Sequence, residues 1–147
     1  MGRYAAQHQT AAGTNLTMIM LESTAAIRSR TAHLILGSDA TPANLAGEFI
    51  FARVSAFGTG GTPLTEGGLD PDTVAATVAA VGGTFTGEPT YSTILLMIPL
   101  NQQATFQWWA NPGYEMYASL GAAAGTALRS VGHGGTPNMN VSVMWEE

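Results

Sequence analysis

The chain has 147 residues, of which 46% are apolar, which is enough for one folded domain with a hydrophobic core and too much for a disordered chain. Only 10% of the residues are charged, lysine and cysteine are absent, and five arginines face ten acidic residues for a net charge of −5. This composition excludes a basic patch for nucleic acid or for a membrane surface, and it excludes disulfides, zinc–thiolate sites and cysteine nucleophiles.

Segments with a strand pattern follow one another along the whole chain. In order they are 14–21, 32–37, 48–57, 93–100, 104–110, 114–120, 127–131 and 138–147. Glycine, proline and small polar residues mark turns between them, at 37–42, 58–63, 66–72, 82–84, 111–113 and 132–137. About eight short strands with such turns predict a single all-β domain over residues 1–147, either a sandwich or a barrel, with a short N-terminal arm at about residues 1–10.

The apolar pattern within each segment predicts which side chains are buried together. Alternation predicts a common side for Leu16, Met18 and Met20, for Phe49 and Phe51, and for Met139, Val141, Val143 and Trp145. The continuous apolar run at 93–100 predicts a strand buried on both faces. Two segments stay open between helix and other structure: 70–83, where Asp70 and Pro71 could begin a helix, and 43–49, which could open with a helical turn.

The low charge is unusual, because an ordinary soluble domain has about 25% charged residues. It favours a chain that covers part of its surface in an oligomer or a larger assembly. A monomer with a neutral polar surface is the alternative. The first ten residues lack the apolar segment of a signal peptide, and the longest strongly apolar run, 94–100, is too short to span a bilayer.

No known catalytic or metal-binding motif is present. A P-loop needs a lysine, the hydrolase motif GxSxG does not occur, and HGG at 133–135 is best explained as a tight turn. His8, His33 and His133 lack the spacing of metal ligands, and Asp70 and Asp72 suit a turn or a helix cap better than calcium. We therefore expect no enzyme activity, metal or cofactor, although a carboxylate pair that only the fold brings together stays open.

The segment 106–117 predicts a hairpin with aromatic side chains on both faces. Phe106 and Trp108 share one face, Gln107 and Trp109 share the other, and the Asn-Pro-Gly turn at 111–113 leads to a second short strand. Three interpretations stay open. The aromatic residues can fill the core from both sides, form a subunit interface, or form a platform for a carbohydrate or another small ligand.

Several motifs together resemble a family of small proteins encoded by tailed bacteriophages. They are GSDATPA (37–43), LDPD (69–72), GEPTY (87–91) and IPLNQQATFQWWANPGYE (98–115), and the likeness extends from about Leu34 to the C-terminal WEE. It implies a virion structural protein, a jelly-roll-like β-sandwich that decorates or cements a capsid as a homotrimer. Relatives commonly have arginine where this chain has Gln103 and Gln107, so ion pairs made there by relatives are absent here.

The resemblance leads to specific expectations about surfaces and partners. We expect Trp109, Tyr114 and Tyr117 to pack between subunits. We expect the loop 58–72 and the arm 3–10 to contact the major capsid protein through Arg3, Tyr4, Thr62, Leu64 and Asp70. The expected location is the capsid exterior, after assembly in the host cytoplasm, with no nucleic-acid or membrane partner. The main alternative is a tail or fibre module that binds a cell-surface glycan, and a small hydrolase is a third reading.

Overall fold

The computed structural model describes residues 1–39 and 41–147, and the regular structure in these residues is entirely β. The longer strands in these ranges are β1 (Arg3–Ala11), β2 (Leu16–Glu22), β3 (Arg30–Ser38), β4 (Ala46–Ala56), β8 (Thr90–Asn101), β9 (Thr105–Trp109), β11 (Gly125–His133) and β12 (Asn138–Glu146). The shorter strands are β5 (Thr62–Pro63), β6 (Gly67–Gly68), β7 (Ala79–Gly82) and β10 (Met116–Tyr117). The described residues contain no helix that is long and apolar enough to span a membrane.

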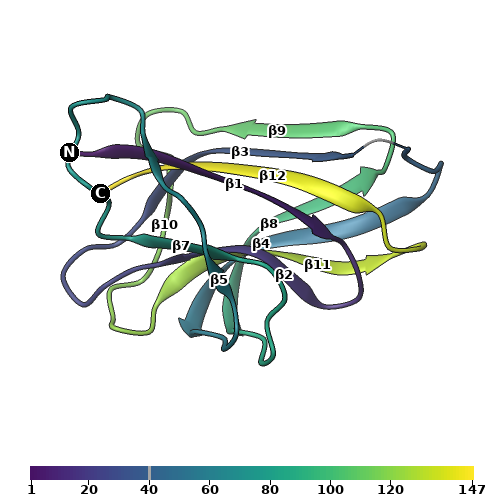
Figure 1. The fold of residues 1–147 in the computed structure, drawn as a ribbon, viewed down its shortest axis with the longest axis horizontal. Coiled ribbons are helices and arrows are strands. Elements are labelled where there is room, and N and C mark those ends of the chain that lie inside the picture. The colour runs from purple at the N-terminus through teal and green to yellow at the C-terminus, as the bar shows by residue number, and fades with distance from the viewer. Residues whose placement is uncertain (40) are drawn as a thin grey trace.

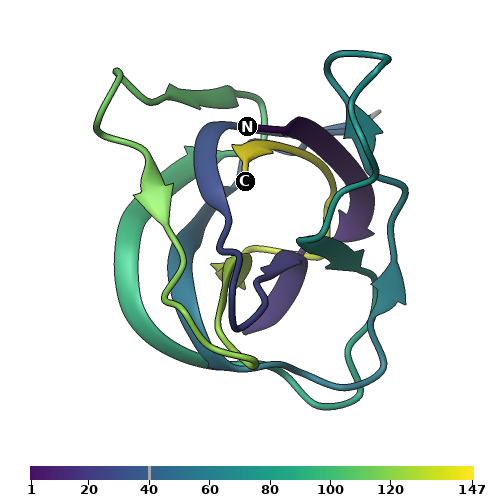
Figure 2. The ribbon, with the colours of Figure 1, turned by 90° about the vertical axis from the view of Figure 1, so that its left-hand side faces the viewer.

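Two antiparallel sheets pack face to face (Figure 1). Sheet A has the order β10-β3-β12-β1-β6, and β9 also pairs with β3. Sheet B has the order β5-β7-β2-β11-β4-β8. Seen from the end, β5, β6 and β7 with their loops flank one side of the sandwich, and β8, β9 and β10 flank the other (Figure 2).

The long strands pair in a nested order. β1 pairs with β12, β2 with β11, β3 with β9 and β4 with β8, as in one long antiparallel hairpin. β12 also pairs with β3, and β11 also pairs with β4. These pairings join the strands into two separate sheets, so the long hairpin is rolled into two layers. This is the strand order of a jelly roll. The prediction of an all-β, jelly-roll-like sandwich is confirmed.

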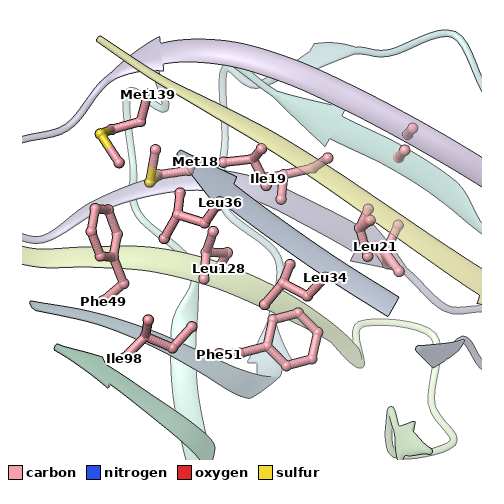
Figure 3. Packing of buried hydrophobic residues seen from close by; sticks show 14 of the residues in the cluster. Met18, Ile19, Leu21, Leu34, Leu36, Phe49, Phe51, Ile98, Leu128 and Met139 are labelled. Carbon is pink, nitrogen blue, oxygen red and sulfur yellow. The ribbon is translucent and has the colours of Figure 1, made fainter. Parts of the chain in front are cut away.

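The core lies between the sheets and follows the alternation of the strands (Figure 3). The predicted inward side chains of β4 and β12 are buried there: Phe49, Phe51, Met139, Val141, Val143 and Trp145. Leu34 and Leu36 from β3 and Leu128 from β11 fill the space between them. Burying one such side chain contributes about 1.5–3 kcal/mol, so this layer is the main source of stability.

A second, smaller cluster covers part of the outer face of sheet B. Met20, Val54 and Ala127 point away from the main core and pack with Val81 and Phe85. Phe57 and Tyr91 border the same cluster. The outer face of sheet B is therefore covered by other segments of the same chain over parts of β2, β4 and β11.

Three predictions about strands are wrong. The run 93–100 is not buried on both faces: β8 is the edge of sheet B, and Ile94 and Met97 are 52% and 59% exposed. The arm at residues 1–10 is not free, because β1 pairs with β12 along all nine of its residues. Alternation also fails in β2. A bulge opposite Leu128 and Arg129 breaks the register, so Met18 joins the main core, Met20 the second cluster, and Leu16 is exposed.

The two open segments are not helical. Residues 43–45 form no regular structure before β4 begins at Ala46, and 70–78 is an irregular segment that leads into β7. The Asp70 carboxylate accepts a hydrogen bond from the Asp72 backbone N–H at 3.0 Å, which is the turn role expected of it. The predicted turn at 37–42 includes Ala40, which lies outside the described residues.

Two glycines of β11 provide a matched test of the register. A Cβ atom at Gly125 would lie 2.2 Å from the Leu21 carbonyl oxygen, whereas one at Gly132 would meet nothing within 4 Å. Gly125→Ala should therefore force β2 and β11 apart and lower the free energy of unfolding by about 1–3 kcal/mol. Gly132→Ala should leave it nearly unchanged. Chemical denaturation of both variants measures the difference, and equal stabilities would contradict the register.

Candidate functional site

The outer face of sheet A is free of charged side chains across its centre. Four neighbouring strands, β9, β3, β12 and β1, each place three side chains there in register. The alternate residues of the same strands, such as Leu34, Phe106 and Val143, point into the core or pack against it. We call this surface the sheet A face: Thr105, Gln107 and Trp109; His33, Ile35 and Gly37; Asn140, Ser142 and Met144; Ala5, Gln7 and Gln9.

This face is hollowed rather than flat. A depression of about 580 Å³ lies over β1 and β12 and is lined by Gln7, Ser142 and Met144, together with Thr65 and Gly67 beside β6. A second hollow of about 210 Å³ continues from it along Gln7, Gln9 and Asn140. The face can therefore receive a protruding surface.

Charged groups lie only at the two ends of the sheet A face among the described residues. At one end, Glu146 binds Arg3 Nε at 2.9 Å and Arg30 Nη1 at 3.2 Å. At the other end, the Gln9 amide donates a hydrogen bond to the Asp39 carboxylate. The centre is thus neutral over all three rows, and the charges at the first end neutralise one another in part.

Trp109 is held in place although it is exposed. Its indole stacks on the His33 ring at 3.4 Å between centroids and 13° between planes, and it covers His33, which is 3% exposed, while Trp109 itself is 62% exposed. The Gln107 amide donates to His33 Nε2 at 3.0 Å, which places the ring proton on Nδ1, 3.4 Å from Met144 Sδ. Burial lowers the pKa of His33, so the ring is neutral at physiological pH.

The base of the hairpin is fixed by ionic contacts. The Glu115 carboxylate accepts hydrogen bonds from Arg30 Nη2 at 2.7 Å and from the Gly113 backbone N–H, and these bonds lower the pKa of Glu115 to about 2. The guanidinium groups of Arg28 and Arg30 lie 4.7 and 5.7 Å from the centre of the Tyr117 ring. Tyr117 is therefore half-buried beneath arginines. Tyr114, by contrast, is 77% exposed at the turn.

A second uncharged surface adjoins the first. The twelve residues of β8, from Thr90 to Asn101, include no charged side chain, and β8 pairs only with β4 among the described strands. Ile94 and Met97 are exposed on it. Beside it, five side chains pack against the main core but are themselves only partly buried: Leu95, Leu96, Phe106, Trp108 and Met116. We call this open side of the sandwich the β8 edge; a long apolar edge strand is a site where another chain can dock.

The residues expected to contact a capsid are dispersed. Arg3 and Asp70 line one hollow of about 360 Å³ near the N-terminus. Thr62 is exposed on β5, and Leu64 is half-buried against the core. Tyr4 is a correction: it is 2% exposed, stacks on Trp145, and donates its hydroxyl to the Val74 carbonyl at 3.0 Å, so it is a core residue.

Within residues 1–39 and 41–147, no three histidine or acidic side chains are close enough to hold a metal ion. The densest polar cluster outside the ion pairs joins Glu88 to Thr17 and Tyr91, with Arg129 4.8 Å from the Tyr91 ring. It ties the segment before β8 to β2, and burial raises the pKa of Tyr91. Its bonds are satisfied internally, as expected of a structural cluster.

The histidines predict a loss of stability in acid. Burial lowers the pKa of His8, His33 and His133. Each imidazole therefore binds a proton more weakly in the folded state than in the unfolded state. The free energy of unfolding should be largest above about pH 6.5, the ordinary histidine pKa, and should fall as the pH drops below it. Thermal unfolding between about pH 7.5 and pH 5 measures this effect.

His133 provides the control for that prediction. Neither of its ring nitrogens has a hydrogen-bond partner among the described residues, and its ring meets Phe49 edge-on at 4.5 Å. His133→Gln places an uncharged amide there and should reduce the loss of stability in acid. A melting temperature that does not change over the whole pH range would contradict the prediction.

Sequence reasoning found the exposed aromatic residues but missed most of the sheet A face. Gln7, Ile35 and Ser142 come from three strands that are far apart in the chain, and no pattern linked them. The available signal was that the outward residues of 138–144 are Asn140, Ser142 and Met144, all uncharged. No known protein family matches this chain, and neither a curated protein nor a solved structure was found to be similar to it.

Proposed function

We propose that this chain is a bacteriophage virion structural protein, a capsid decoration or cement protein that forms a homotrimer and stabilises the shell. The observation that carries the proposal is the pair of adjoining uncharged surfaces, the sheet A face and the β8 edge. Neither surface has a side chain that can form an ion pair at neutral pH, and they expose Trp109, Ile94 and Met97; depletion of charge together with exposed aromatic and methionine side chains is typical of protein contacts. The resemblance of several sequence motifs to those of a tailed-phage protein family supports the same kind of assembly.

The proposed mechanism is mechanical. A trimer at the junction of neighbouring capsid subunits links them and resists the pressure of the packaged DNA. Each contact can be weak, because three linked contacts raise the overall affinity without any new chemistry. In the proposal, the hollow lined by Arg3 and Asp70 and the exposed loop around Thr62 face the major capsid protein, since none of these residues is among the twelve positions of the sheet A face.

The proposal is tested by producing the protein together with the major capsid protein encoded by the same genome. The expected result is that the protein sediments with the shells and raises the temperature at which they open. A variant with Arg3→Ala and Asp70→Ala should bind less, with an unchanged trimer mass. Shells that sediment without the protein and open at the same temperature would overturn the proposal.

One observation favours a second candidate, a module that binds a neutral glycan. The exposed indole of Trp109 is rigidly held, and Gln7, Gln107 and Asn140 supply uncharged amides on the same sheet A face. Sugar rings stack on such indoles and bond to such amides. A glycan array probed with the protein and with Trp109→Ala tests this candidate, which requires binding that the variant loses.

A further inference from the structure

We propose that the trimer contact runs from edge to face: the β8 edge of one copy packs into the hollow of the sheet A face of the next copy. The inference rests on the homotrimer of the proposed function and specifies the two surfaces that make it. Its occupant is a second copy of this chain. It accounts together for the exposed Ile94 and Met97, the exposed Trp109 and the uncharged hollow around Ser142.

Charge supports a second copy as the partner. The chain carries a net charge of −5, so two copies repel wherever their acidic surfaces meet. The sheet A face is neutral at all twelve positions, with His33 held neutral by burial, and β8 carries no charge over twelve residues. These two surfaces can therefore meet with few charges between them, the exception being Glu48 of β4, which lies opposite Pro99 of β8; a strongly charged partner would leave its own charges buried without a counterion.

The positions of the two surfaces favour a ring. The sheet A face lies on the outside of one sheet, and the β8 edge lies on the open side of the sandwich, next to β9, the outermost strand of that face (Figure 2). They are different patches that point in different directions. A contact between different patches of identical chains is heterologous, and its repetition closes a ring when the rotation allows it. A trimer is the smallest such ring beyond a pair.

The area favours a closed ring, in which each subunit uses both surfaces. Strand spacing makes the sheet A face about 14 by 14 Å between backbone centres, and side chains widen it to on the order of 400 Å². The β8 edge is taken to be of similar size, so each contact of a ring buries on the order of 400 Å² per subunit, about half of a standard interface. Each subunit of a closed ring makes two such contacts, and ring closure links them so that they reinforce one another. The sheet A face alone, used in a simple face-to-face pair, gives each subunit only one such contact.

Cross-linking tests the inference directly, because the chain has no cysteine of its own. Ser142→Cys labels the sheet A face and Met97→Cys labels the β8 edge, and both side chains lie at least partly in solvent. With a short bis-maleimide, each single variant should give almost no cross-linked product. The two variants mixed after dissociation and reassociation should give covalent dimers, and the chain carrying both cysteines should give covalent dimers and trimers.

Ala79→Cys is the matched control. Ala79 is exposed on β7, on the opposite side of sheet B from β8, and paired with Ser142→Cys it should give no product. Efficient cross-linking of Ser142→Cys alone would overturn the inference in favour of a face-to-face contact. A trimer by mass in which the double variant does not cross-link would also overturn it, while the shell-binding experiment would still decide the proposed function separately.

Discussion

Replacing Ile35 with lysine is expected to convert the oligomer into folded monomers. Ile35 lies at the centre of the sheet A face, between Gln107 and Ser142 of the neighbouring strands. In a monomer, the lysine ammonium at this outward position reaches water, so the fold should survive. In the proposed contact the ammonium is buried without a partner, which costs about 3–5 kcal/mol and weakens association by roughly 100-fold or more.

Light scattering over a dilution series, combined with thermal unfolding, measures both halves of this prediction. Ala79→Lys is the control, because it adds the same charge to an exposed position at the far edge of sheet B. The control should keep the mass of the parent protein. If Ile35→Lys and Ala79→Lys have the same mass as the parent at every concentration, the sheet A face is not a subunit interface.

Replacing Trp109 with alanine is expected to have the second largest effect. Trp109 is exposed in the single chain, yet its ring is already fixed on His33, so little conformational freedom is lost when a partner covers it. Truncating a tryptophan of this kind costs about 2 kcal/mol or more, which is roughly a 30-fold weaker association. Sedimentation equilibrium of the parent protein and of Trp109→Ala measures the difference in their association constants.

The same substitution has an independent readout at His33. The indole covers the imidazole, and burial is what lowers the pKa of His33. In Trp109→Ala the ring becomes exposed, so its pKa should rise toward the ordinary value, which an NMR titration of the histidine signals detects. Trp109→Phe keeps an aromatic ring over His33 and should retain most of the depression. A His33 pKa that does not change in Trp109→Ala would contradict the role given to the stack.

Local sequence was sufficient for the fold class and for the direction of many side chains. Period-two alternation correctly put Phe106 and Trp108 on one face of the strand and Gln107 and Trp109 on the other, because neighbouring side chains of a strand point to opposite faces whatever the strand pairs with. The same rule placed Phe49, Phe51 and the inward residues of β12. The scarcity of charge was also visible in composition alone.

The position of a strand within its sheet was not visible in this way. The apolar run of β8 has the composition of a strand buried on both faces, yet β8 is an edge, because the partner of a strand is chosen by segments far away in the chain. The same holds for β1, whose sequence is that of a polar arm but whose pairing with β12 fixes it in sheet A.

The sequence by itself therefore determined an all-β domain with few charges and a strand that carries aromatic side chains on both faces. Only the tertiary structure decided that the uncharged residues of β1, β3, β9 and β12 form one continuous face and that an apolar edge adjoins it. The physical reason is that alternation is set within each strand, whereas the nested pairing and register of the roll come from contacts between residues separated by most of the chain.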